Sequence, residues 1–420
     1  MIDKKSLNDV LLLQNKQIEK NITERDIKSK IEEYKDTPFI IIITGIRRGG
    51  KSTVLHDIRN DDCYYVNFDD ERLFDFDIAD FQTLYEALIE LFGAKSIFIF
   101  DEIQNVKGWE RFVRRLYNSG KKIYVTGSNS SLLSKEMGTH LTGRNIALEL
   151  FPFNFREYLR YHNKEIDPES QFTSLEKSEI RNLFKKYLES GGFPEYLITE
   201  KPEYLKNLYE NILYRDIIVR HRIRDEHAIK TVANYAASNI GKEISFNKLR
   251  KMTGQSSATT IKQYFNFLED SYLIFLLPRF SYSYKKQVYY NKKLYFIDPV
   301  LAKIIGFRFS EDSGRILENT VFLNLRQFHS EIFFHKDQHE CDFLVKQGNE
   351  ISKAFQVCWD INDQNRKREI AGIQEAMQNY NLEKGYIITY EQEDKVKING
   401  KNVFLIPAWK WLLEYHHESD

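Results

Sequence analysis

The chain of 420 residues carries 61 lysine and arginine residues against 61 aspartate and glutamate residues, so its formal net charge is zero. This balance excludes a strongly basic field over the whole protein, of the kind that binds nucleic acid non-specifically, and leaves only single segments as candidates. The length predicts two or three domains, and the composition, 42% hydrophobic and 29% charged, is typical of a soluble globular protein.

Three widely separated cysteines, Cys63, Cys341 and Cys358, predict neither a disulfide framework nor a cysteine metal site, and they favour a reducing environment. The N-terminal residues include acidic side chains and lack a long apolar core, so they do not resemble a signal peptide. The longest apolar runs, such as residues 272–278, are too short to span a bilayer. We therefore expect a cytoplasmic protein without a membrane segment.

Residues 7–35 are polar with spaced leucine and isoleucine, which predicts one or two amphipathic helices. The following run, PFIIIIT at 38–44, is β-branched and bounded by proline and glycine, as expected for a strand buried on both faces of a parallel sheet. Strand-like and helical patterns then alternate, which predicts right-handed βαβ crossovers and a doubly wound sheet. The further strands are expected at 63–70, 96–102 and 122–129, and the helices between them at 81–93 and 109–120.

The string GIRRGGKST, from Gly45 to Thr53, follows the first strand directly and fits the pattern G-x-x-x-x-G-K-[ST]. Glycines at this spacing let backbone N–H groups converge on phosphate oxygens, and the following helix adds its positive N-terminal end. Lys51 is expected to reach the β- and γ-phosphates, and the Ser52 hydroxyl to bind Mg²⁺. The plain alternative, a glycine-rich turn with a solvated lysine, is disfavoured by the buried strand before it. The nucleotide-binding residues are therefore predicted to be Gly45, Gly49, Gly50, Lys51, Ser52 and Thr53.

Four apolar residues place Asp101 and Glu102 at the carboxyl end of the third strand, where ligands bind in open α/β sheets. Asp101 is predicted to hold the Mg²⁺ shell through water and Glu102 to polarise the attacking water. Two adjacent carboxylates are costly there unless a cation balances them. The next strand ends in VTGSN, so Ser128 or Asn129 is expected to orient the lytic water, with a plain turn as the alternative.

Further segments occur with these motifs in a characteristic order: VNFDDERL, FIFDEIQNVKGWERFVRRLY, TGSNSSLLSKEMGTHLTGR, LFPFNFREYL and GGFPEYL. Over nearly its whole length the chain resembles a prokaryotic AAA+-superfamily ATPase family, which joins a nucleotide domain to a winged helix and a C-terminal domain of unknown function. The resemblance implies Mg²⁺-dependent ATP hydrolysis, with Asp101 and Glu102 on the metal side and Asn129 or Ser128 as the sensor.

The resemblance also implies an arginine that reaches the γ-phosphate of a neighbouring subunit, where it stabilises transition-state charge. Arg144, in LTGR, is the first candidate, and Arg114 and Arg115 are its competitors. A surface salt bridge is the alternative for each of them. Because such an arginine acts in trans, a homo-oligomer is expected, although the sequence does not give its stoichiometry.

Residues 225–280 contain three helical patterns with tight glycine turns, and two strand-like stretches follow, FLLPRFSYSY and QVYYNKKLYFID. Three helices followed by a β-hairpin predict a winged helix-turn-helix. The surrounding segment, 205–310, carries 18 lysine and arginine residues against 8 aspartate and glutamate residues, a net charge of +10. It is therefore the candidate DNA contact.

The expected wing mixes aromatic residues with four lysines that are suited to a phosphate backbone, Lys285, Lys286, Lys292 and Lys293. The expected recognition helix offers only Lys262 as a cation and ends in acidic residues, which disfavours base readout. The alternative is a winged helix that makes only ATPase-lid or protein contacts, so a protein partner remains open.

A helix at 313–327 that carries Glu318, a strand that carries Asp342 and a further strand resemble the restriction-endonuclease-like PD-(D/E)xK fold. In that chemistry carboxylates hold Mg²⁺ and a lysine positions the hydroxide. Gln356 and Cys358 stand where glutamate and lysine would lie. We therefore expect a degenerate domain without nuclease activity, in which Glu318 and Asp342 are remnants of the fold.

The predicted fold class is α/β: an AAA+-like P-loop NTPase sheet, then an all-helical and winged-helix domain, then a C-terminal α/β endonuclease-like domain. The expected function is hydrolysis of Mg-ATP coupled to conformational change on a DNA or protein partner. The alternatives are a slow nucleotide-dependent switch or scaffold, and an ATP-coupled nuclease. The expected domains are a helical segment at 1–36, the ATPase core at 37–165, a helical lid or linker at 166–224, the winged helix at 225–296 and the degenerate domain at 297–420.

Overall fold

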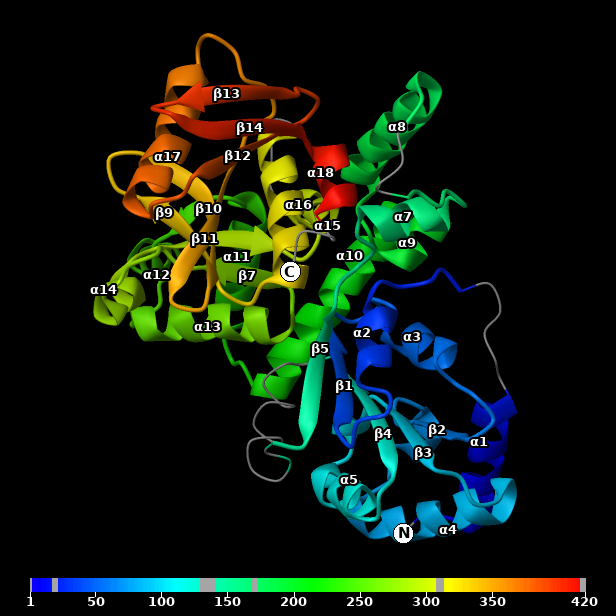
Figure 1. Cartoon of the computed structure of the whole chain (residues 1–420). Coiled ribbons are helices and arrows are strands. Elements are labelled where there is room, and N and C mark those ends of the chain that lie inside the picture. Colours follow the sequence, from blue (N-terminus) through cyan, green and yellow to red (C-terminus); the bar gives the residue numbers. More distant parts are fainter. Residues whose placement is uncertain are drawn as a thin grey trace. The chain divides into compact units, whose positions relative to one another are not determined.

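The computed structural model describes residues 2–16, 22–128, 141, 143–167, 172–306 and 313–415. The chain forms two compact units, one built on a single sheet and the other on two sheets, each with its own hydrophobic core (Figure 1). Unit 1 comprises Met1–Phe151 with Asp270–Tyr272, and unit 2 comprises Pro152–Glu269 with Leu273–Asp420. Among the described residues, no helix combines the length and apolar character needed to cross a membrane.

A five-stranded parallel sheet with the order β2-β3-β4-β1-β5 forms the centre of unit 1. Its isoleucine-rich strand is buried on both faces, because Ile40 and Ile42 pack into one core while Ile41 and Ile43 pack into the other. Burial of alternate side chains in opposite cores is typical of a parallel sheet covered on both faces. The predicted P-loop NTPase fold is confirmed. The strands are β1 (Ile40–Gly45), β2 (Cys63–Asn67), β3 (Ile97–Asp101), β4 (Lys122–Gly127) and β5 (Asn145–Leu150).

Helices cover both faces of this sheet. Residues of α1, α4 and α5 fill one core, and residues of α2 and α3 fill the other. The two helices predicted near the N-terminus are present as α1 and α2. The bounds are α1 (Lys4–Lys16), α2 (Ile27–Glu33), α3 (Lys51–Asp57), α4 (Phe81–Phe92) and α5 (Trp109–Asn118), with short 3₁₀ turns at Glu71–Leu73, Ile78–Asp80 and Ile103–Asn105.

The strand order decides which loops meet. Because β4 lies between β1 and β3, the carboxyl ends of these three strands lie side by side at one edge of the sheet. The loop after Gly45, the carboxylates after Phe100 and the turn at Ser128 therefore converge there. This edge is where ligands bind in open α/β sheets.

Unit 2 begins with helices that include the GGFP turn. Asp298 accepts a hydrogen bond from the Gly192 N–H at 2.8 Å and also caps α15. A Cβ atom on Gly192 would lie 2.2 Å from the Phe153 carbonyl oxygen, so the close approach explains the glycine. The helices are α7 (Phe155–Tyr161), α8 (Ser174–Ser190), α9 (Pro194–Thr199), α10 (Pro202–Asn211), the π-helix η4 (Ile212–Val219) and α15 (Pro299–Ile305).

Three helices and a small antiparallel sheet with the order β6-β8-β7 follow. The prediction of a strand at QVYY is wrong, because these residues belong to a short helix. The Ser283 side chain caps this helix, and none of its residues is buried, so no neighbouring strand competes for its backbone. The elements are α11 (Glu226–Ser238), β6 (Glu243–Ile244), α12 (Phe246–Thr253), α13 (Ala258–Asp270), β7 (Ile274–Leu277), α14 (Tyr284–Tyr289) and β8 (Lys292–Phe296).

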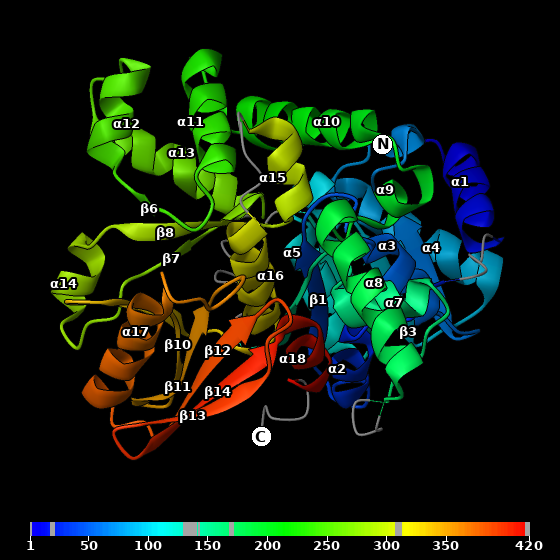
Figure 2. The same cartoon turned by 90° about the horizontal axis from the view of Figure 1, so that it is seen from above.

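A six-stranded mixed sheet with the order β13-β14-β12-β11-β10-β9 closes the chain. Strands β9, β10 and β11 are antiparallel, whereas β12 runs parallel to β11. Helix α17 lies on one face of the sheet, and α16 and α18 lie on the other (Figure 2). The elements are α16 (Ser313–Phe328), β9 (Ile332–Lys336), β10 (Glu340–Gln347), β11 (Glu350–Val357), α17 (Arg366–Asn379), β12 (Lys384–Thr389), β13 (Asp394–Ile398), β14 (Lys401–Pro407) and α18 (Ala408–Glu414).

Candidate functional site

The predicted phosphate loop connects β1 to α3 in unit 1. Gly45 ends the strand with φ 147°, and a Cβ atom there would lie 2.1 Å from the Leu150 carbonyl oxygen. Gly50 precedes the helix in the left-handed region, with φ 98°. Ser52 and Thr53 lie in the first turn of α3. The glycines therefore stand where the backbone requires them, and the helix begins at the lysine, as the motif predicts.

Lys51 is buried, with 4% of its surface exposed. Its Nζ donates to the carbonyl oxygens of Gly45 and Ile46, at 3.1 Å each, and lies 3.6 Å from Glu102 Oε1. The ammonium is thus folded onto its own loop, beside the N-terminal end of α3. A triphosphate placed over the loop would compete with these carbonyls for the same charge.

Asp101 is completely buried at the end of β3. Its oxygens accept hydrogen bonds from the hydroxyls of Tyr65, at 2.9 Å, and Thr126, and a further hydrogen bond joins it to Ser52. Burial, followed by the charge of Glu102, raises the pKa of Asp101, and the three hydroxyls act in the opposite direction. The adjacent Ser52 hydroxyl and Asp101 carboxylate are oxygen ligands of the kind Mg²⁺ prefers, so the residues fit this metal.

Glu102 has a left-handed backbone, with φ 50°, and its N–H donates to Thr126 Oγ1 at 2.9 Å. Non-glycine residues in this region are strained and concentrate at functional sites. Burial acts to raise the pKa of Glu102, but the ammonium of Lys51 and the amide of Gln104 outweigh it and lower the pKa. The carboxylate is therefore ionised at neutral pH, as a general base for water must be.

The predicted sensor position is described only in part. Ser128, at the end of β4, is 2% exposed, and its hydroxyl helps to lower the pKa of Glu102. The structure thus places Ser128 beside the Glu102 carboxylate. Asn129 lies outside the described residues, so its role stays a prediction.

Arg144 lies at the opposite edge of the sheet from the phosphate loop. Its carbonyl oxygen accepts a hydrogen bond from the N–H of Ile40, the first residue of β1, at 2.8 Å. Six strand residues separate this end from the loop, roughly 20 Å at about 3.3 Å per residue. Its guanidinium lies 5.8 Å from the Tyr117 ring. Arg144 therefore does not reach the nucleotide site of its own chain.

The two competing arginines lie on α5. Arg115 Nη1 donates to Gln82 Oε1 at 2.7 Å, and its guanidinium lies 5.3 Å from the Phe112 ring. Both Arg114 and Arg115 are exposed. The contacts of Arg115 therefore hold it against its own helix and α4.

Sequence reasoning missed several residues of this site. Tyr65 and Thr126 hold Asp101, and Gln104 donates to Glu102 Oε2. Arg25 is 5% exposed, and it donates to the Gly49 carbonyl at 2.9 Å and the Phe151 carbonyl at 2.6 Å. Of these residues, Thr126 alone could have been predicted from its neighbours in the sequence. Side chains alternate along a strand, so Thr126 lies on the same face as Ser128.

Comparisons with known proteins indicate the family to which the chain belongs. The profile of an AAA domain family matches residues 37–159, and that of a domain of unknown function matches residues 181–310. The chain is 38% identical to the uncharacterised protein MJ1544 of Methanocaldococcus jannaschii, covering 99% of this chain and 97% of the relative. It is 29% identical to an uncharacterised protein of Haemophilus influenzae, with 92% and 98% covered.

Among solved structures, a signal-transduction ATPase with numerous domains from Pyrococcus horikoshii is similar over 74% of this chain and 47% of that one. The identity is 14% and the TM-score 0.28, too low to carry an argument. The parallel sheet, the phosphate loop and the matched AAA domain define a P-loop ATPase of the AAA type. The chain belongs to the prokaryotic AAA+-type ATPase family that includes its archaeal and bacterial relatives.

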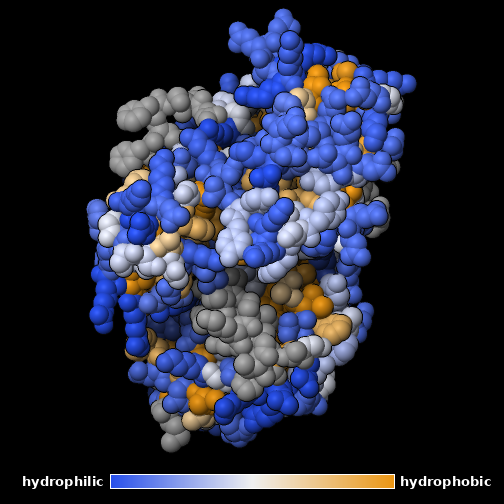
Figure 3. Space-filling model, turned by 90° about the vertical axis from the view of Figure 1, so that its left-hand side faces the viewer, coloured by the Kyte–Doolittle hydropathy of each residue, from blue (hydrophilic) through white to orange (hydrophobic). Residues whose placement is uncertain are grey.

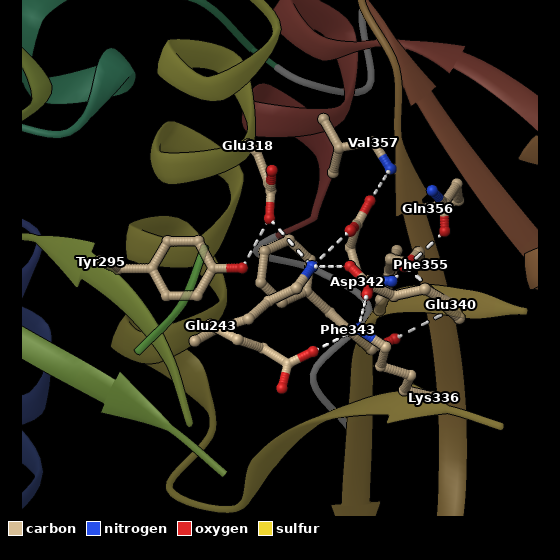
Figure 4. A network of polar contacts seen from close by, with 12 residues as sticks. Glu243, Tyr295, Glu318, Lys336, Glu340, Asp342, Phe343, Phe355, Gln356 and Val357 are labelled. Atoms are coloured by element: carbon tan, nitrogen blue, oxygen red, sulfur yellow. Dashed lines mark hydrogen bonds and ion pairs between the residues drawn. The ribbon is translucent and has the colours of Figure 1, made fainter. Parts of the chain in front are cut away.

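A second cluster of charged groups lies in unit 2. Glu318 on α16 and Asp342 on β10 face each other, and Glu340 also points toward them (Figure 4). The Nζ of Lys293, from β8, lies 2.8 Å from Asp342 Oδ1, 2.7 Å from Glu340 Oε1 and 3.4 Å from Glu318 Oε1. The Tyr295 hydroxyl donates to Glu318 Oε1 at 2.7 Å. An ammonium thus stands among three carboxylates.

The prediction that Lys293 belongs to an exposed basic wing is wrong, because only 2% of its surface is exposed. Burial acts to lower its pKa, but Asp342 and Glu318 outweigh this and raise the pKa of Lys293 well above the ordinary range. The ammonium therefore stays charged. Sequence reasoning missed this contact because the partners are 25 and 49 residues away along the chain.

Gln356 and Cys358 have local structural contacts. Gln356 Oε1 accepts from the Asp342 N–H at 3.3 Å, and its Nε2 donates to Glu369 Oε2 at 2.8 Å. Burial raises the pKa of Cys358 to about 11, so its thiol is neutral near pH 7 and does not replace an ammonium. Within the described ranges, no group of three or more His, Cys, Asp or Glu side chains is arranged to hold a metal ion.

We predict that Lys293→Met lowers the free energy of unfolding by about 3–5 kcal/mol, because it leaves buried carboxylates without their cation. Urea unfolding of the purified chain measures the change. Lys292→Met, at the adjacent and less buried lysine, is the matched control and should cost less than about 1 kcal/mol. Equal effects of the two substitutions would contradict the assigned role of Lys293.

The raised pKa of Glu318 predicts how the free energy of unfolding depends on pH. Burial raises its pKa to about 7. As pH rises, the unfolded chain therefore loses this proton at a lower pH than the folded chain. Protonation of Glu318 contributes its full stabilisation at low pH, and this contribution is lost as pH rises toward about 7. The contribution changes by up to about 1.4 kcal/mol per pH unit. Urea unfolding of Glu318→Gln between about pH 5 and about pH 7 should show a flatter profile than wild type. The exposed Glu383→Gln should keep the wild-type slope.

Proposed function

We propose that the chain binds Mg-ATP at Gly45–Thr53 and hydrolyses it with Glu102 as the general base. The observation that carries the proposal is the convergence of one ammonium and two carboxylates at one edge of the sheet. Lys51 lies 3.6 Å from Glu102, and Asp101 is hydrogen-bonded to Ser52. These are the charges and ligands that phosphoryl transfer to water requires.

Each residue has a separate role in this proposal. The loop N–H groups and Lys51 bind the phosphates, and Ser52 with Asp101 holds the metal. A bound Mg²⁺ ion would neutralise part of the negative charge of the phosphates. Glu102 accepts the proton of the attacking water, and Ser128 or Asn129 orients that water. Gln104 keeps the Glu102 carboxylate in position.

Arg144 completes the site in the proposed mechanism only as a residue of a neighbouring copy. Its backbone lies at the amino end of β1, while the loop follows the carboxyl end. We therefore propose a homo-oligomer in which the nucleotide of one subunit meets Arg144 of the next. Arg114 and Arg115 remain the competing candidates.

We further propose that α11, β6, α12, α13, β7 and β8 form a winged helix that passes the effect of ATP turnover to a DNA or protein partner. The order of these elements and the β6-β8-β7 sheet support this interpretation. The three cysteines are free and buried, which supports a cytoplasmic location.

We predict that Glu102→Gln lowers steady-state ATP turnover about 10²–10⁴-fold, because it removes the general base. ATP binding, measured with a fluorescent analogue, should be retained. The exposed Glu90→Gln on α4 is the matched control and should turn over ATP like wild type. Negligible turnover by the wild type itself, with ATP still bound, would favour the slow switch or scaffold instead.

We predict that Arg144→Ala also lowers turnover about 10³-fold or more while ATP binding persists. Mixing Arg144→Ala with Glu102→Gln chains tests the role in trans. The first contributes an intact base and the second an intact arginine, so mixed oligomers should recover part of the turnover. If mixtures that assemble recover no activity, Arg144 does not act in trans, and Arg114 or Arg115 becomes the candidate.

A further inference from the structure

Exposed aromatic side chains are concentrated on and beside α14, at the place of the proposed wing. Tyr282, Tyr284 and Tyr289 are 81%, 80% and 78% exposed, and Val288 is 51% exposed. The other large hydrophobic side chains of the described chain that are exposed by more than half are far apart in the sequence: Phe74, Leu175, Ile198, Val219 and Met252. Contiguous groups of this kind mark interaction sites.

The sequence segment that contains α14 carries charge of one sign. From residue 271 to residue 297 the sequence contains no aspartate or glutamate, while Arg279, Lys285, Lys286 and Lys292 all lie within this segment. Lys285 and Lys286 are exposed, and neither forms an ion pair with another described residue. We define the tyrosine–lysine surface as Tyr282, Tyr284, Lys285, Lys286 and Tyr289.

The base of this surface is fixed to the C-terminal sheet. The N–H of Phe280 donates to the Phe334 carbonyl at 2.9 Å, and the N–H of Phe334 donates to the Pro278 carbonyl at 3.0 Å. The ring of Phe280 also packs edge-on against Tyr380, with centroids 5.2 Å apart. Because the segment is tied down on this side, the exposed tyrosines are presented by an ordered element, which lowers the entropic cost of binding.

We propose that the tyrosine–lysine surface binds single-stranded nucleic acid. Exposed tyrosine rings offer faces on which unpaired bases stack, and the two ammonium groups attract the phosphates between them. Duplex bases stack on each other and leave no free face, so a duplex would use only the lysines. The inference deepens the proposed function by naming the partner class, and it rests on that function only for the coupling to ATP.

A purely apolar protein partner fits this surface less well. Figure 3 views the side on which α14 lies in Figure 1, and hydrophobic residues appear there as separate patches among hydrophilic ones. Protein interfaces depend on a desolvated centre with few lysines. Two lysines between Tyr284 and Tyr289, in a segment of the sequence without acidic residues, instead match a partner that carries a regular negative charge.

The test is fluorescence anisotropy of the full-length chain, without nucleotide, against a labelled mixed-sequence oligonucleotide as single-stranded DNA, single-stranded RNA and duplex. Wild type should bind single strands of either kind more tightly than duplex. Tyr284→Ala with Tyr289→Ala should weaken single-strand binding about tenfold or more, because stacking is lost. The exposed Leu175→Ala and Ile198→Ala on other helices are the matched controls and should leave binding unchanged.

A salt series tests the lysines. Lys285→Gln with Lys286→Gln should reduce the slope of log Kd against log salt by about 1.4, since each phosphate contact on a single strand contributes about 0.7. Lys185→Gln with Lys186→Gln, an exposed adjacent pair on α8, is the matched control and should leave the slope unchanged.

Two outcomes would overturn the proposal. One is duplex binding as tight as single-strand binding with no effect of the tyrosine substitutions, which would indicate backbone contact alone. The other is no binding of either nucleic acid at low salt. ATP turnover measured on the same preparations distinguishes this proposal from the proposed function. Turnover without nucleic-acid binding contradicts only the role of the tyrosine–lysine surface, and nucleic-acid binding without turnover contradicts only ATP hydrolysis.

Discussion

Buried charge must meet an opposite charge or a hydrogen-bond donor, and this constraint shapes both units of the chain. In unit 1, Lys51 and Glu102 lie close together while hydroxyl groups surround Asp101. In unit 2, Lys293 lies among the carboxylates. A charge without a partner in either place would cost several kcal/mol.

The two clusters satisfy this constraint differently. Lys51 contacts mainly the carbonyl oxygens of its own loop, which a phosphate can replace at little cost. Lys293 contacts carboxylates, and its displacement would leave several buried negative charges. The first arrangement suits a site that exchanges ligands. The second suits a permanent junction between β8 and the C-terminal sheet, with Gln356 and Glu369 bonded beside it.

Local pattern predicted much of the nucleotide site. The isoleucine run, the glycine spacing and the carboxylates after a buried strand each lie within a few residues, so β1, Lys51 and Asp101 followed from the sequence. Strand β5 was not predicted, because Leu150 is the one buried residue of this edge strand and the hydrophobic pattern of the strand is therefore weak. The partners of Asp101 were also missed, since Tyr65 and Thr126 meet it through sheet order. Lys293 was assigned to the surface because charge alone does not reveal a distant carboxylate.

If Arg144 acts in trans as proposed, its place across the sheet from Lys51 has a consequence for assembly. Contacts in which one face supplies an arginine to the opposite face of the next copy are heterologous, so they close into a ring or continue as a filament. In an open filament the terminal subunit holds a nucleotide site that no neighbour completes. Average turnover per chain would then increase with filament length, and dilution of the protein would itself act as an inhibitor.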